Sequence, residues 1–507
     1  MYDNNINSGL FGVGNKIYSY SINHSTSRDK YCLACQHTSM LKLGCRPRNF
    51  TLTVVIILAI SNMLLTFLLL QSETCTSNNK DDKLIKNINN DKFVTEKIDG
   101  VQKDDDYNDN PSTINLIDDD IDDEKVDNIN INVNLGKWDN QRIIKMFDSV
   151  LIGSKFTELS KNSKICLATQ SSIEKLHSLV QVAHHWTSSI SVALYVAGDE
   201  EYNAVNKYLI YLRYCYKPIR ERINFSLAIP HNKIPINELN IINNYSSIKN
   251  LNCSLPEATL VNMLNKISTK HTSWKSKNSY PQNHMRNLAR KNCQSDYLFL
   301  TDVDIVPSIG FAESIDLFLH NIPDNKCDKC AFVVPTYELD KRVKFPINKT
   351  ELVRLAKKGL ARPFHWKVFI HNQYATNFSR WIMDVVPGSK GYTNLINGKT
   401  YVCHNVTNFE FLYEPFYVAK DTAPPHDERF VGYGYTRNTQ VYEMYVAGYQ
   451  FQILSPVFTV HWGLQTRKGR LPWREKQNIL NRKKFDQFKR EIFTKYERDV
   501  SKPLRKL

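Results

Sequence analysis

The sequence has 507 residues, of which 42% are hydrophobic and 11% aromatic, so the chain can bury a sizeable core and is not disordered throughout. Its 66 lysines and arginines outnumber 51 aspartates and glutamates, giving a formal net charge of +15. A basic body favours an anionic ligand, such as a nucleotide diphosphate or an acidic polysaccharide. The membrane anchor predicted below argues against nucleic acid as the partner.

The charge is distributed unevenly along the chain. Residues 81–130 carry 16 acidic residues against 6 lysines, whereas the part after residue 130 carries about +21. Residues 71–136 consist mainly of Asp, Asn, Lys and Ser and have almost no aromatic residues. Such a segment cannot bury itself, so we expect a disordered acidic stem before a globular domain over residues 137–507.

Residues 50–70 form an uncharged run rich in Leu, Ile and Val. The run is long enough to cross a bilayer as a helix, and the polar segment of residues 1–49 before it argues against a cleaved signal peptide. Lys42, Arg46 and Arg48 precede it, and the positive-inside bias therefore predicts a cytosolic tail at residues 1–49. We interpret residues 50–70 as a single-pass signal anchor; the alternative is a buried core helix.

Sequons and cysteines agree with a body that lies across the membrane from the tail. Eight of the 11 cysteines follow the predicted anchor, an even number that suits an oxidising compartment. Cys327-x-x-Cys330 could be half of a zinc site, but disulfides or free thiols are the interpretation that we favour. Six Asn-x-Ser/Thr sequons begin at Asn224, Asn244, Asn252, Asn348, Asn377 and Asn405.

The predicted globular domain alternates strand-like and helix-like runs, which indicates an α/β sheet. Along the C-terminal segment, four large apolar residues recur at helical spacing and predict a packing face, at Phe485, Phe488, Ile492 and Tyr496. The expected helices cover residues 201–214 and 283–291, and the expected strands cover residues 191–197, 224–229, 297–301, 331–334, 414–419 and 451–454.

Two acids follow the apolar strand predicted at residues 297–301. Asp302 and Asp304 are spaced i, i+2 at its carboxyl end, where open α/β sheets bind ligands. Two carboxylates there can hold Mn²⁺ or Mg²⁺, which in turn bridges the phosphates of a nucleotide diphosphate. The alternative is a solvated turn.

Three further residues are candidates for the same site. His461 leaves the apolar run of residues 457–461 and is a candidate third metal ligand, since imidazole accepts Mn²⁺; the alternative is an ordinary surface histidine. Asn283 and Arg286 lie in the first turns of the helix predicted at residues 283–291. A guanidinium there could contact donor phosphates or a uracil edge, although a solvated basic face is an equally good interpretation.

Residues 426–435 combine acids, glycines and aromatics, and supply candidates for a general base. Asp427 or Glu428 could accept the proton of an acceptor hydroxyl. We favour Asp427, because Glu428 is expected to pair with Arg429; Glu443 is a further candidate. The alternative is an ion-paired helix start.

Six sequence blocks resemble the glycosyltransferases of family 49, in the same order and over roughly residues 190–500. They are YPQNHMRNLAR (280–290), TDVDIVPS (301–308), FVVPTYEL (332–339), TNFSRW (376–381), EPFYVA (414–419) and DERFVGYG (427–434). The segment after Arg362, PFHWKVFIHNQYA, matches only in part. The resemblance implies a GT-A fold with a mostly parallel central sheet, in a type II Golgi membrane protein.

The resemblance also implies the chemistry. The expected reaction transfers glucuronic acid from UDP-glucuronate, with inversion and Mn²⁺ (or Mg²⁺), in β1,4 linkage to xylose on O-mannosyl glycans of dystroglycan type. Alternatives are a family 49 transferase of another UDP-sugar, xylosyl or N-acetylglucosaminyl, and a non-catalytic luminal glycan-binding protein. The resemblance implies a donor site at Asp302, Arg286 and Asn283, metal ligands at Asp302, Asp304 and His461, and a base at Asp427 or Glu428.

Overall fold

The computed structural model describes residues 131–235, 251–323, 328–384, 399–466 and 472–498. The predicted cytosolic tail, the apolar span at residues 50–70 and most of the predicted stem lie outside these ranges. Within them, no helix combines the length and the apolar character needed to span a membrane.

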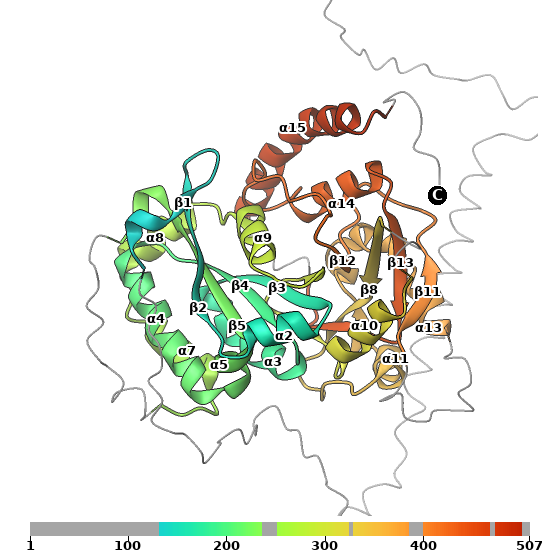
Figure 1. The fold of residues 1–507 in the computed structure, drawn as a ribbon, viewed down its shortest axis with the longest axis horizontal. Coiled ribbons are helices and arrows are strands. Elements are labelled where there is room, and N and C mark those ends of the chain that lie inside the picture. The colour runs from blue at the N-terminus through green and yellow to red at the C-terminus, as the bar shows by residue number, and fades with distance from the viewer. Residues whose placement is uncertain (1–130, 236–250, 324–327, 385–398, 467–471, 499–507) are drawn as a thin grey trace, which may run out of the picture. The chain divides into compact units, whose positions relative to one another are not determined.

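A mixed sheet of ten strands forms the centre of the described fold (Figure 1). Their order across the sheet is β1-β2-β5-β4-β3-β6-β12-β8-β13-β11. The strands are β1 (Lys137–Trp138), β2 (Ile144–Ile152), β3 (Ile165–Ser172), β4 (Ile190–Tyr195), β5 (Ile223–Pro230), β6 (Tyr297–Leu300), β8 (Cys330–Val334), β11 (Tyr401–Asn405), β12 (Phe416–Lys420) and β13 (Gln450–Ser455).

The sheet is less parallel than the sequence predicted. β5, β4, β3 and β6 form a parallel block, and β8 and β13 are also parallel, but the other five neighbouring pairs are antiparallel. Parallel neighbours require a crossover connection, usually a helix. Helices separate β3, β4 and β5 along the chain, as the parallel block requires. β12 runs antiparallel between β6 and β8.

All six predicted strands are present, with ends shifted by at most two residues, but β1, β2, β3 and β11 of this sheet were not predicted. The two predicted helices correspond to α4 (Gly198–Cys215) and α9 (Gln282–Lys291). The other helices are α2 (Phe156–Asn162), α3 (Leu179–His185), α5 (Lys217–Arg222), α7 (Pro256–Leu264), α8 (Thr269–Lys277), α10 (Phe311–His320), α11 (Lys349–Lys357), α12 (Trp366–Phe369), α13 (Phe378–Met383), α14 (Arg437–Val446) and α15 (Pro472–Lys495).

Helices cover both faces of the parallel block (Figure 1). On one face, α9 packs Met285, Leu288 and Ala289 against the small side chains Ala168 and Ala193 of β3 and β4. The opposite face and the helices α3, α4, α5 and α10 share a larger apolar cluster. The sheet is thus the middle layer of an α/β/α arrangement, and this is why nearly every residue of β3 and β4 is buried.

A second sheet of four strands, ordered β10-β9-β14-β7, brings distant segments to the end of β6. Its strands are β7 (Ile305–Pro307), β9 (Thr336–Leu339), β10 (Ala361–Pro363) and β14 (Thr459–Trp462). β7 starts directly after Asp304, and its register pairs Ile305 with His461. The pairing of β7 with β14 therefore fixes the distance between the two predicted metal ligands.

The predicted packing face of the C-terminal helix is confirmed. Phe485, Phe488 and Ile492 of α15 are buried in a cluster with Phe430 and with Tyr442 of α14. Burial of each such side chain contributes roughly 1.5–3 kcal/mol, so this stripe is enough to hold α15 against α14.

Disulfides connect several elements of the described fold. Cys166 of β3 is bonded to Cys293 just after α9, and Cys215 is bonded to Cys253. Cys330 is also in a disulfide, whereas Cys403 is a free thiol. The interpretation of Cys330 as a disulfide cysteine, in preference to a zinc ligand, is therefore confirmed.

Candidate active site

Asp302 and Asp304 emerge at the carboxyl end of β6, as predicted. Residue 300 ends the strand, and β3 lies beside it with Ala168 opposite Leu300. The side chains of Asp302 and Asp304 are 32% and 30% exposed, so both carboxylates remain reachable from solvent. The short loop between β6 and β7 thus presents two acids at the edge where ligands of α/β sheets bind.

Two buried arginines balance the charge of Asp302. The nearest guanidinium nitrogens of Arg437 and Arg286 lie 2.8 Å and 3.4 Å from its Oδ1, and Gln170 donates to the same oxygen at 3.2 Å. Burial alone would raise the pKa of Asp302, but the two guanidinium groups lower it to about 2. Asp302 therefore stays ionised at any physiological pH, and the two cations together exceed its charge.

Arg437 was not predicted, and it follows the turn that contains Gly432 and Gly434. Gly432 and Gly434 have φ of +81° and +83°, and this left-handed backbone directs the chain into α14. Asn481 of α15 donates to the carbonyl of Gly434 at 2.8 Å and so fixes the turn. Arg437 then lies 3.9 Å over the ring of Phe416 and reaches Asp302.

Arg286 lies beside Asp302, and Asn283 contacts Arg286. Asn283 is fully buried, and its Oδ1 accepts a hydrogen bond from Arg286 at 3.2 Å. Its Nδ2 donates to the backbone carbonyl of Asp427 at 2.7 Å. Both polar atoms of Asn283 are therefore used within the protein, which orients the guanidinium of Arg286.

The structure brings Asp304 and His461 together. His461 Nε2 lies 3.7 Å from Asp304 Oδ2, and Lys175 Nζ lies 3.8 Å from the same oxygen. No cluster of three or more His, Cys, Asp and Glu side chains that could hold a metal ion occurs in the described ranges. A carboxylate and an imidazole at this separation suit one Mn²⁺, whose other positions would be filled by phosphate and water oxygens. Asp302, by contrast, directs Oδ1 at the arginines.

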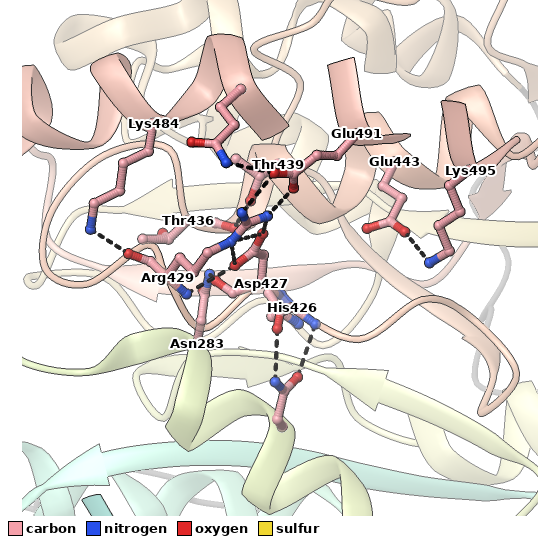
Figure 2. Close-up of polar contacts among 12 residues, drawn as sticks. Asn283, His426, Asp427, Arg429, Thr436, Thr439, Glu443, Lys484, Glu491 and Lys495 are labelled. Atoms are coloured by element: carbon pink, nitrogen blue, oxygen red, sulfur yellow. Dashed lines mark hydrogen bonds and ion pairs between the residues drawn. The ribbon is translucent and has the colours of Figure 1, made fainter. Parts of the chain in front are cut away.

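Asp427 and Glu428 lie in the loop before α14, and their contacts differ from the prediction. Figure 2 shows Asp427 with Arg429. Arg429 contacts Asp427 through Nε at 3.0 Å and a terminal nitrogen at 2.6 Å, and it also pairs with Glu491 of α15. The side chain of Glu428 points toward α9 instead, where Oε1 accepts a hydrogen bond from Asn287 at 3.0 Å. The expected Glu428–Arg429 pair was therefore wrong, because Arg429 folds back onto the residue two positions earlier.

A helix start was the alternative for these two acids, and it was also wrong, since α14 begins only at Arg437. The third candidate base, Glu443, accepts from Lys495 at 2.8 Å (Figure 2). It also accepts from the hydroxyl of Tyr496 at 3.0 Å. No hydrogen bond or ion pair between described residues links Asp427, Glu428 or Glu443 to Asp302 or Asp304. Catalytic roles for these three acids stay predictions.

A different acid, Glu414, lies beside the arginines. Its Oε2 accepts a hydrogen bond from Nδ2 of Asn372 at 3.1 Å, and the same Nδ2 lies 2.8 Å from Nδ1 of His365. Burial raises the pKa of Glu414, and Arg437 offsets part of the rise. Both Asn372 and His365 come from the segment after Arg362, so the segment that matched the family only in part forms this wall of the site.

Glu338 of β9 fixes the loops that carry these residues. It is fully buried and accepts from Nε of Arg362 at 2.7 Å, from the backbone N–H of His365 at 2.9 Å and from that of Gln465 at 3.1 Å. One buried carboxylate thus holds both the segment after β10 and the segment after β14. The left-handed backbone of His365, with φ of +61°, persists because of this anchor.

We expect Glu338→Gln to lower the free energy of unfolding by about 3 kcal/mol, because it leaves the buried side of Arg362 without its counter-charge. The matched control is Asp328→Asn, which removes an ion pair with Lys420 from a side chain that is 85% exposed. The control should cost no more than about 0.5 kcal/mol. Denaturant titration of both variants provides the measurement, and equal destabilisation would contradict the anchoring role of Glu338.

Comparisons with known proteins agree on one family. Residues 164–497 match the model of the family described as "Glycosyl-transferase for dystroglycan". β-1,4-Glucuronyltransferase 1 of Mus musculus is 29% identical over 340 residues, which cover 66% of this chain and 76% of that protein. The xylosyl- and glucuronyltransferase LARGE1 of the same organism is 24% identical over 61% of this chain and 32% of its own.

Among solved structures, GalNAc-T7 with UDP, GalNAc and Mn²⁺ covers 68% of this chain and 52% of its own, with a TM-score of 0.33 and 8% identity. TarS of S. aureus in complex with UDP has a TM-score of 0.25 and 10% identity, and covers 59% of this chain and 60% of its own.

Proposed function

Because the chain belongs to glycosyltransferase family 49, we propose that it is an inverting, metal-dependent glucuronyltransferase with a GT-A fold. The proposed reaction moves glucuronic acid from UDP-glucuronate to a xylose-terminated O-mannosyl glycan, in β1,4 linkage. One observation carries the proposal: a carboxylate balanced by two arginines lies next to a carboxylate–imidazole pair, at the ligand-binding end of the sheet.

The charges of this site suit a nucleotide diphosphate. Arg437 and Arg286 carry one positive charge more than Asp302 neutralises, and both guanidinium groups are buried within the protein. Arginine is well suited to phosphate oxygens because its planar group donates two parallel hydrogen bonds. In the proposed complex the diphosphate accepts from these two side chains.

Asp304 and His461 are the residues that would hold Mn²⁺. Their Oδ2 and Nε2 atoms already face each other, so neither side chain needs to move far to share one cation. A bound divalent ion would neutralise charge that develops on the departing diphosphate. Lys175, 3.8 Å from Asp304, adds a further positive charge to the same place.

The stereochemistry follows from the donor. UDP-glucuronate has an α anomeric bond, so a β-linked product requires a single in-line displacement by the acceptor hydroxyl. That hydroxyl must lose its proton as it attacks, which calls for a carboxylate or an equivalent base near the donor.

A family 49 transferase of another UDP-sugar is the second candidate. One observation favours it: the relative LARGE1, which is 24% identical, is named a xylosyl- and glucuronyltransferase. The non-catalytic alternative is less favoured, because the paired acids and their counter-charges are all in place.

A donor screen tests the reaction. With UDP-glucuronate, UDP-xylose, UDP-glucose and UDP-N-acetylglucosamine and a β-xyloside acceptor, we expect transfer from UDP-glucuronate to exceed the others by at least about tenfold in kcat/KM. A tenfold preference is about 1.4 kcal/mol, roughly the strength of one charge-assisted hydrogen bond to the sugar carboxylate. Preference for another donor would reject the glucuronyl assignment and leave the family assignment intact.

The metal site has its own test. Asp304→Asn should reduce transfer by about 100-fold or more without changing the melting temperature, because it removes cation binding but no packed apolar group. Asp296→Asn is the matched control, since this exposed acid lies at the other end of β6. His461→Ala should raise the Mn²⁺ concentration for half-maximal activity by about tenfold. Full activity of Asp304→Asn would overturn the site.

We also propose that the chain is a type II Golgi protein with a luminal body, on the strength of the charge pattern around residues 50–70. When the full chain is made in a secretory pathway, peptide-N-glycosidase should then increase its mobility. Asn252, Asn377 and Asn405 are exposed and should carry glycans, whereas Asn224 is 1% exposed, donates to Ser149, and should stay unmodified. Absence of any glycan would contradict the topology.

A further inference from the structure

Glu414 and Asp302 leave neighbouring strands at the same end of the sheet. β12 is antiparallel to β6, with Tyr417 opposite Leu300, so the residues just before β12 lie beside those just after β6. Arg437 lies between the two acids: it contacts Asp302 at 2.8 Å and stacks on Phe416, two residues after Glu414. Its charge and that of Asp302 both act on the carboxyl of Glu414.

The position of Glu414 is fixed by its backbone as well as by its side chain. Its N–H donates to the carbonyl of Asn372 at 2.9 Å, and its carbonyl accepts from Nε2 of Gln373 at 2.9 Å. Asn372 and Gln373 are 4% and 2% exposed, so the frame around the acid is rigid. Glu414 itself is half-buried, and Oε1 accepts no hydrogen bond from the described residues.

A chain of contacts joins Glu414 to the other pair of the site. His365, whose Nδ1 lies 2.8 Å from Asn372, stacks on Phe364 with ring centroids 3.9 Å apart. Phe364 in turn packs against His461, the neighbour of Asp304, with centroids 5.6 Å apart. Glu414 and the pair of Asp304 and His461 thus flank one continuous group of side chains, with the arginines beside them.

We propose that Glu414 is the general base of the glycosyl transfer, with Asn372 as the residue that positions it; this rests on the proposed function. The acceptor oxygen forms a bond to C1 of the donor sugar while its proton passes to the carboxylate of Glu414. The bond between C1 and the phosphate oxygen breaks at the same time, and its electron pair leaves with UDP. The deprotonated Oε1 is the atom that accepts the proton.

The other acids are worse placed for this role. Oδ1 of Asp302 is already occupied, since guanidinium nitrogens of Arg437 and Arg286 lie 2.8 Å and 3.4 Å from it. Asp427 is enclosed by Arg429, which also binds Glu491, on the side toward α15 (Figure 2). No ion pair between described residues involves Glu414, and burial raises its pKa, which makes its carboxylate a better base.

Steady-state kinetics of the full chain with UDP-glucuronate, Mn²⁺ and a β-xyloside test the assignment. Glu414→Gln keeps the shape of the side chain, and we expect it to lower kcat by about 100-fold or more. The affinity for UDP in the presence of Mn²⁺ should stay within about twofold. The matched control is Glu410→Gln, an exposed acid in the same loop before β12, which should keep wild-type kcat.

Two further variants separate chemistry from folding. Glu414→Asp keeps the charge but retracts it, and should recover part of the rate that Glu414→Gln loses. Asn372→Ala should lower kcat with little change in KM, and should add little to Glu414→Gln, since both act on one proton transfer. Melting temperatures close to that of the wild type in all variants show that the loss is not unfolding.

The possible results separate the role of Glu414 from the proposed function. If Glu414→Gln turns over at wild-type rate, the proposal is overturned, and loss of rate in Asp427→Asn instead would restore the acid favoured by the sequence. If the wild type transfers a different sugar, the glucuronyl assignment fails but the same variants still test Glu414. If the wild type binds UDP and Mn²⁺ yet transfers no sugar from any donor, the proposed function itself fails, and the proposed role of Glu414 with it.

Discussion

The contact of Asp302 with Arg437 and Arg286 is the interaction on which the rest of the site depends. The arginine side chains are only 8% and 5% exposed, so neither guanidinium can rely on water for its solvation. Removing one partner of a buried ion pair costs about 3–5 kcal/mol, because the remaining charge stays desolvated. One carboxylate thereby holds together the end of β6, the start of α14 and the middle of α9. Asp302 consequently has a structural role in addition to the ligand-binding role predicted for it.

The acids of the site differ in acidity and in exposure because their surroundings differ. Asp302 is kept strongly acidic by cations, whereas burial weakens the acidity of Glu414 a short distance away. Asp304 remains partly exposed beside an imidazole. The three carboxylates belong to one end of the sheet, yet their surroundings differ in charge and in access to water. These differences arise from which helix or loop packs over each acid.

Features encoded in short stretches of sequence could be predicted. The two acids after an apolar strand, the histidine after another apolar run and the amphipathic stripe of α15 each follow from local pattern, and the structure places each of them as expected. Helix α9 was predictable for the same reason, with Arg286 on the face that meets Asp302. The spacing of apolar residues along the chain is enough to predict such features, because it shows which side of a helix or strand is buried.

Features that depend on strand order or on side-chain direction could not be predicted in this way. Arg437, Asn372 and Glu414 meet because β12 lies between β6 and β8, a pairing that no local pattern reveals. The same inserted strand contributes two of the antiparallel pairs in a sheet that was expected to be mostly parallel. Arg429 pairs with Asp427, two positions earlier, and not with the adjacent Glu428. This choice depends on the conformation of the loop that packs against α15.

The turn that presents Arg437 is held by Asn481, which lies on the C-terminal helix α15. A chain made from its N-terminus therefore exposes Asp302 and Arg286 long before the segment that completes the site has been synthesised. A stop codon anywhere between Arg437 and Asn481 would leave both predicted metal-binding aspartates and Arg437 itself intact in the product, yet remove the anchor of that arginine. A truncation late in the gene would thus disturb the position of Arg437 without changing any acid of the site.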